Sequence, residues 1–89
     1  MFDWDEANLD HIGRHGAEPG EVEEALSDPR RRSEGAYNSR GERRWAMLGA
    51  TESGRILFVV FARDSLGVRV VTARPATDRE SRRYRRGGR

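Results

Sequence analysis

The sequence predicts an α+β fold in which two N-terminal helices precede a four-stranded antiparallel β-meander and a C-terminal helix. Three observations lead to this prediction. Apolar residues recur with a helical period up to residue 29, they alternate with a period of two from residue 30 to residue 74, and a helix-capping motif follows Pro75. The chain has 89 residues and no cysteine, so we expect one domain over 1–86, a flexible basic tail at 87–89 and no disulfide.

The first helix is expected to begin after Asp3 and to continue to about His15. Asp3 and Glu6 have the spacing of a capping pair, and Gly16 is suited to the end of a helix. Within this helix His11 and His15 are one turn apart, so both side chains fall on the same side.

The second helix is expected to begin near Pro19, because proline is favoured in the first turn of a helix. Glutamates crowd its start, where the helix dipole stabilises negative charge. The dipeptide at 28–29, Asp-Pro, should end it. A narrow apolar stripe faces the core and consists of Val22, Ala25 and Leu26.

Four strands are expected, at about 30–36, 42–50, 55–63 and 67–74. The connections between them are short and rich in turn-forming residues, which indicates that consecutive strands are antiparallel neighbours. The third strand is apolar on both faces and therefore belongs in the middle of the sheet.

The fourth strand carries two arginines whose relative placement matters for any site. Strict alternation places Thr72 and Arg74 on one face and Arg69 on the other. The two arginines can share a pocket only if the strand twists or bulges near its end. After the strand, Thr77 and Glu80 form a capping box that opens a helix of about ten residues.

Charge is divided unevenly along the chain. Residues 1–29 contain nine carboxylates and one basic residue, Arg14, whereas residues 30–89 contain sixteen arginines and six carboxylates. The chain has no lysine. Guanidinium groups are permanently charged and match pairs of phosphate oxygens, so the basic part favours a nucleic-acid partner.

The sequence shows no sign of a membrane or secretory protein. Its apolar runs are shorter than the ~20 residues that cross a bilayer, and the first residues lack the pattern of a signal peptide. We therefore expect a cytoplasmic protein without a membrane partner.

Several motifs together resemble the BrnT family of ribonuclease toxins from type II toxin–antitoxin systems, whose fold is similar to RelE. They are Phe2-x-Trp4-Asp5, Arg14-His15-Gly16, the apolar strand with Val59-Val60, the passage from Arg69 to Thr77, and Glu80-x-x-x-Tyr84. The resemblance spans nearly the whole chain, and the passage from Arg69 to Tyr84 is its most specific part. It implies an endoribonuclease that inhibits translation by cleaving RNA. It also implies a cognate antitoxin, usually a ribbon-helix-helix protein, through which alone the toxin would reach operator DNA.

RNA cleavage without a metal ion requires a base for the 2′-hydroxyl, cations for the phosphorane and an acid for the leaving 5′-oxygen. The groups available for proton transfer are His15, Glu80 and Tyr84, and Arg74 is the best-placed cation. Supporting cations that would bind substrate are Arg69, Arg14 and Arg83. No cofactor and no metal ion is expected.

Each of these side chains also has a structural interpretation. Glu80 can serve only as the capping partner of Thr77, Arg74 can form a salt bridge with Glu80 or Asp78, and Tyr84 can pack on the sheet. His15 can bond a carbonyl at the helix end, and His11 with His15 has the spacing of a helical metal pair. Two other functions also remain open: a non-catalytic RNA-binding module, and a regulatory partner of a DNA-binding antitoxin.

Overall fold

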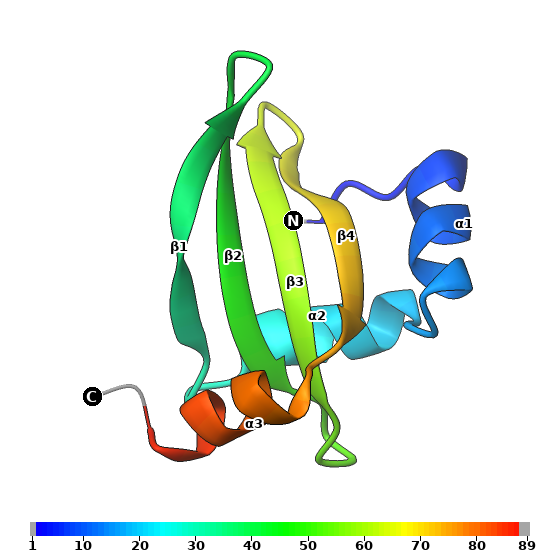
Figure 1. The fold of residues 1–89 in the computed structure, drawn as a ribbon. Coiled ribbons are helices and arrows are strands. Elements are labelled where there is room, and N and C mark those ends of the chain that lie inside the picture. The colour runs from blue at the N-terminus through cyan, green and yellow to red at the C-terminus, as the bar shows by residue number, and fades with distance from the viewer. Residues whose placement is uncertain (1, 88–89) are drawn as a thin grey trace.

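A computed structural model describes residues 2–87 of the chain (Figure 1). It contains three helices and one four-stranded sheet, in the predicted order. The elements are α1 (Glu6–Arg14), α2 (Pro19–Ser27), β1 (Arg32–Ser39), β2 (Glu42–Ala50), β3 (Ile56–Asp64), β4 (Gly67–Pro75) and α3 (Asp78–Arg85). The predicted α+β layout is therefore confirmed.

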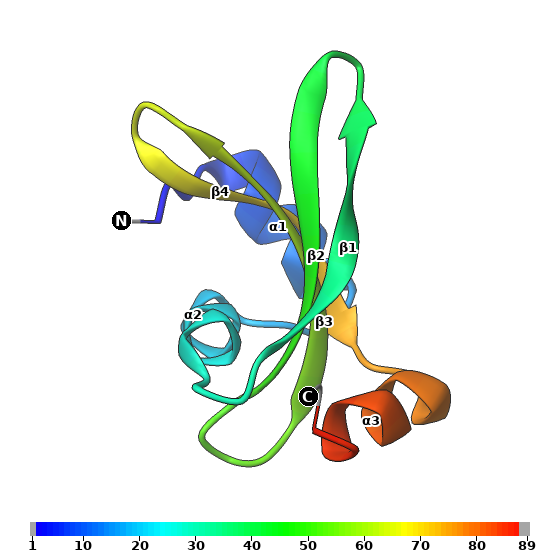
Figure 2. The ribbon, with the colours of Figure 1, turned by 90° about the vertical axis from the view of Figure 1, so that its left-hand side faces the viewer.

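The sheet is an antiparallel meander with the strand order β1-β2-β3-β4. The apolar strand β3 lies between β2 and β4, as predicted. Figure 2 shows α2 and α3 on opposite faces of the sheet, and Figure 1 shows α1 beside the outer edge of β4. One face of the sheet is thus covered by the first two helices, and the other carries only the short helix α3 at one end.

The core lies between one face of the sheet and the first two helices. Its largest fully buried side chains are Ile12, Leu57, Val22, Val59 and Val70. Leu48 is also fully buried, but it pairs with Phe58 and lies on the other face of the sheet. Gly49 allows α2 to approach β2 closely, because a Cβ atom there would lie 2.0 Å from the carbonyl oxygen of Ala25. The predicted apolar stripe of α2 does face this core: Val22 and Ala25 are fully buried and Leu26 packs against them.

Helix α1 begins later than the sequence suggested. Its N-cap is Asp5, whose side chain accepts a 2.8 Å hydrogen bond from the backbone N–H of Asn8. The predicted pairing of Asp3 with Glu6 was wrong, because the backbone N–H of Asp3 instead donates to the carbonyl of Val68 on β4. Extended pairing of this segment with β4 keeps Asp3 out of the helix.

The outer edge of the sheet is formed by β1, which begins at Arg32 instead of at residue 30. The two preceding residues form a turn in which the backbone N–H groups of Arg30 and Arg31 both donate to Asp28. A bulge interrupts the pairing of β1 with β2 between Ser33 and Gly35. The open edge is therefore irregular near its start.

Within residues 2–87, no helix has both the length and the apolar character needed to cross a membrane. Residues 88 and 89 of the predicted basic tail lie outside the described residues.

Candidate active site

A bulge in β4 determines which side chains share the face of the sheet that carries α3, called the open face below. Thr72 pairs with Val60 and Val70 pairs with Phe61, so Val71 is an extra residue on β4. Beyond this point the alternation of faces is reversed. The expectation from strict alternation was therefore wrong. A bulge does bring Arg69 onto the face of Arg74, but it lies at Val71 in the middle of β4 and not near the end of the strand.

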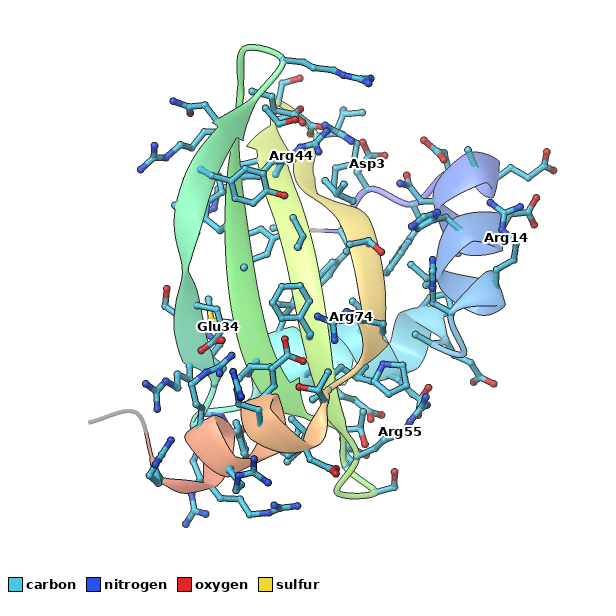
Figure 3. All side chains as sticks on the ribbon, viewed as in Figure 1. Asp3, Arg14, Glu34, Arg44, Arg55 and Arg74 are labelled. Carbon is cyan, nitrogen blue, oxygen red and sulfur yellow. The ribbon has the colours of Figure 1, made fainter. Side chains whose placement is uncertain are left out.

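The consequence is a row of three polar side chains on one face. Arg69, Thr72 and Arg74 pair with Ala62, Val60 and Phe58, which alternate on a single face of β3. This is the face that carries α3, as Figure 3 shows for Arg74. The bulge equally places Val70 and Ala73 together in the core.

Arg74 is held in a fixed position by three groups. Its two Nη atoms donate to the two carboxylate oxygens of Glu80 at 2.8 and 3.0 Å, and Nη1 also donates to the carbonyl of Pro75 at 3.2 Å. The guanidinium lies over the ring of Phe58, 4.3 Å from its centroid. The side chain is still 37% exposed. Arg74 is therefore both oriented and accessible, which is what binding a phosphate requires.

Glu80 is buried and serves two partners. Besides Arg74, it accepts a 2.9 Å hydrogen bond from the backbone N–H of Thr77, and this completes the predicted capping box of α3. The bonds from Arg74, and then the one from Thr77, lower the pKa of Glu80 to about 2 despite its burial. A carboxylate with that pKa is a weak base at neutral pH. Its surroundings suit a residue that positions Arg74.

Tyr84 lies one turn after Glu80 on α3 and bonds to a different carboxylate. Its hydroxyl donates to the carboxylate of Asp28, which also accepts from the backbone N–H groups of Ala50 and Arg30. Burial, and then the bond to Asp28, raises the pKa of Tyr84 to about 12. Burial raises the pKa of Asp28 too, but its three hydrogen bonds outweigh that effect and lower it. The catalytic role of Tyr84 stays a prediction.

His11 lies on α1, beside β4, and His15 is the C-cap residue of that helix. The Nε2 atom of His11 is 2.9 Å from the hydroxyl oxygen of Thr72. The rings of His11 and His15 meet edge to face, with centroids 4.8 Å apart, and His15 is exposed. Since Thr72 and Arg74 are two residues apart on one strand face, their side chains stand about 7 Å from each other. An imidazole pair, with His15 exposed and His11 half-buried, therefore lies beside the strand that carries Arg74.

The predicted substrate-binding cations occupy three separate places. Arg69 bonds to Glu42 and lies 3.8 Å from Asp64, at the far end of the open face from α3. Arg83 bonds to Glu34 of β1, with an Nε to Oε1 distance of 3.1 Å. Arg14 is exposed on α1, far from Arg74 in Figure 3.

Among the described residues, no group of three or more histidine, cysteine or carboxylate side chains could hold a metal ion. The two tryptophans are mostly covered. Trp4 packs against the core and donates to Glu23, and Trp45 stacks on Phe61.

Sequence reasoning missed two parts of this site. The contact between His11 and Thr72 joins residues 61 positions apart and has no local signal. The cation–π contact of Arg74 with Phe58 depends on strand register, which follows from the bulge.

Comparison with known protein families identifies the class to which this chain belongs. The family model described as "Ribonuclease toxin, BrnT, of type II toxin-antitoxin system" matches residues 4–80, which include α1, α2, the sheet and the Arg74–Glu80 pair and end within the first turn of α3. A search of curated proteins found no match. The fold and the match define a ribonuclease toxin of the type II toxin–antitoxin class. The chain belongs to the BrnT family.

Proposed function

We propose that this protein is a metal-independent endoribonuclease that cleaves RNA by attack of the ribose 2′-hydroxyl and so inhibits translation. The observation that carries the proposal is the placement of Arg74, fixed yet accessible, on the strand face that also presents Thr72 and its histidine partner. Family membership supports ribonuclease activity in general. The residue roles below are part of the proposal.

Arg74 would bind the scissile phosphate and stabilise the charge that develops in the phosphorane. Glu80 uses two of the five guanidinium N–H donors, and one of these nitrogens also reaches the Pro75 carbonyl, so donors remain for a phosphate oxygen. Because the guanidinium is oriented before substrate arrives, little reorganisation is needed in the transition state.

His15 and His11 would transfer the protons. In this scheme one imidazole accepts the proton of the 2′-hydroxyl as its oxygen attacks phosphorus. The bond from phosphorus to the 5′-oxygen then breaks, and the 5′-oxygen takes a proton from the other, protonated imidazole. The products are a 2′,3′-cyclic phosphate and a 5′-hydroxyl. Histidine suits both steps because its unperturbed pKa lies near neutrality.

The experiment is incubation of purified protein with single-stranded RNA in excess chelator, followed by analysis of the new ends. Cyclic phosphate ends are expected in chelator. A strict requirement for added divalent cation would overturn the proposed chemistry.

Arg74→Ala should reduce the single-turnover cleavage rate by about 100-fold or more, because a charge-stabilising donor acts mainly in the transition state. RNA binding should fall only modestly. The matched control is Arg43→Ala, which removes an exposed arginine of β2. His15→Ala should also reduce cleavage, with loss of the pH dependence that a histidine imposes.

A second candidate function is a non-catalytic RNA-binding module. The observation that favours it over catalysis is that Arg74, Arg69 and Arg83 each bond to a carboxylate, which would give these arginines structural roles and leave RNA binding to other arginines. Equal losses of binding and cleavage in Arg74→Ala, or no cleavage by the wild type, would support this function instead.

A type II toxin has an antitoxin partner, and we propose that here it is a ribbon-helix-helix protein that carries the complex to operator DNA. The open face of the sheet beside α3 is the surface it would need to cover to block Arg74. The acidic helices α1 and α2 would offer a second contact. A regulatory role alone would be indicated if the protein left RNA intact and changed only the affinity of its antitoxin for operator DNA.

A further inference from the structure

A second basic site lies at the other end of α3 from Glu80. A groove of about 590 Å³ runs between the segment that follows α2 and the C-terminal end of α3. Its walls include four arginines, two from each side, together with an aromatic ring and a proline: Arg30, Arg31, Arg85, Arg86, Tyr84 and Pro29.

The arginines of this groove differ in their pairing from those on the open face. All four are exposed, and within residues 2–87 none of them lies within salt-bridge distance of a carboxylate. The nearby carboxylate of Asp28 is already occupied by the hydroxyl of Tyr84 and by two backbone N–H groups. On the open face, by contrast, Arg74 and Arg69 are neutralised by bonded glutamates. The groove is therefore where four cations remain available to a polyanion.

Tyr84 gives the groove a second feature of single-stranded RNA sites. Its bond to Asp28 fixes the ring on the groove wall while the ring remains partly exposed. Proteins that bind single strands combine arginines along the backbone with aromatic rings on which bases stack. The combination favours RNA over an acidic peptide, which would use the cations alone.

We infer that this groove is a binding site for the phosphodiester backbone of single-stranded RNA, separate from the Arg74 site. This inference rests on the proposed function, because it takes RNA as the substrate. From Glu80 to Arg86 the helix rises about 9 Å. Successive phosphates of a stacked strand are about 3.4 Å apart along its axis. Phosphates bound at the two sites would thus be about three nucleotide steps apart on one strand.

The test measures binding of RNA that cannot be cleaved, so that it does not depend on catalysis. The probe is a fluorescent single-stranded RNA of ten nucleotides, fully 2′-O-methylated, and its dissociation constant is measured over a range of salt concentrations. The groove variant is Arg30→Ala with Arg85→Ala. The matched control is Arg40→Ala with Arg43→Ala, which removes two exposed arginines from the β1–β2 hairpin at the opposite end of the sheet (Figure 1).

The groove variant should bind more weakly at every RNA sequence, and its salt slope should fall by about 1.4, since each single-strand phosphate contact contributes about 0.7. The control should retain the wild-type slope. Tyr84→Leu should weaken binding at least about fivefold, whereas Tyr84→Phe, which keeps the ring, should not. Circular dichroism of each variant establishes that it is folded.

Several results would overturn the inference. They are wild-type binding by a folded groove variant, an equal loss in the control, or displacement of the RNA by a polyglutamate of equal charge. Affinity for a dinucleotide equal to that for the decamer would also overturn it, because a single phosphodiester cannot contact both sites. If the groove variant loses binding but the wild type never cleaves unmodified RNA, the groove stands and the proposed catalysis fails.

Discussion

Glu80 links the fold to the site, and its substitution by glutamine gives a prediction that can be worked out from the structure. Glutamine keeps an oxygen that can accept from Thr77 but removes the charge that holds Arg74. The wild-type carboxyl has its pKa lowered from 4.5 to about 2. Each pH unit of such a difference corresponds to about 1.4 kcal/mol, so the shift corresponds to roughly 3 to 4 kcal/mol. Solvent screening of the partly exposed Arg74 reduces the expected value to about 1–3 kcal/mol.

The direction of the pH dependence follows from the lowered pKa. The stabilisation is fully present above the ordinary glutamate pKa of 4.5 and is lost as the pH falls towards about 2. The free energy of unfolding is measured by urea denaturation of the wild type and Glu80→Gln between pH 2 and pH 7. The difference between the two proteins should be about 1–3 kcal/mol at pH 7 and should approach zero near pH 2.

The matched control is Glu6→Gln, at an exposed glutamate in the first turn of α1. This substitution should change stability by less than about 0.5 kcal/mol at any pH. A Glu80→Gln difference that stays constant from pH 7 to pH 2 would refute the reasoning, because it would mean that the carboxylate charge contributes nothing to the fold.

Three further predictions concern packing, the histidine contact and the tyrosine. Gly49→Ala should destabilise the fold by about 3 kcal/mol or more in urea denaturation, because its new methyl group would collide with the backbone of Ala25 and α2 would have to move away. Thr72→Val should leave the free energy of unfolding within about 1 kcal/mol of wild type. It should nevertheless slow single-turnover RNA cleavage about tenfold, because His11 loses the hydroxyl that orients its ring. An unchanged rate would contradict the role given to that contact. Tyr37→Phe leaves Tyr84 as the sole tyrosine, and absorbance titration of that variant should give a midpoint of about 12. Adding Asp28→Asn should lower the midpoint, because the bond to Asp28 raises the pKa of Tyr84. A midpoint that does not move would show that Asp28 is not the partner.

Local signals in the sequence were sufficient to predict most of the fold. Helix ends depend on neighbouring residues, and Pro19, Gly16 and the Thr77–Glu80 capping box all act as predicted. The apolar character of β3 predicted its interior position for the same reason, since burial on both faces leaves no polar alternation. The α1 N-cap was missed because a bond from Asp3 to β4, a distant segment, competes with a local signal.

The site was less predictable than the fold. Arg74 and Glu80 were predicted as site residues and also as partners of each other, and the structure brings them together. The faces of β4 could not be assigned, because the extra residue at the bulge is determined by pairing with β3. The position of the Tyr84 hydroxyl also could not be predicted, because its partner Asp28 lies 56 residues away in the sequence.

The two edges of the sheet differ in how another strand could pair with them. α1 covers the outer side of β4, where Asn8 caps the carbonyl of Val70, so no further strand can add there. β1 has no such cover, but its ladder is broken between Ser33 and Gly35 and is flanked by the charged pair of Arg32 and Glu34. Interrupted backbone pairing and charge at an edge both oppose edge-to-edge pairing of one molecule's sheet with another's. The irregular start of β1 would thereby help to keep a toxin with an exposed sheet face from aggregating.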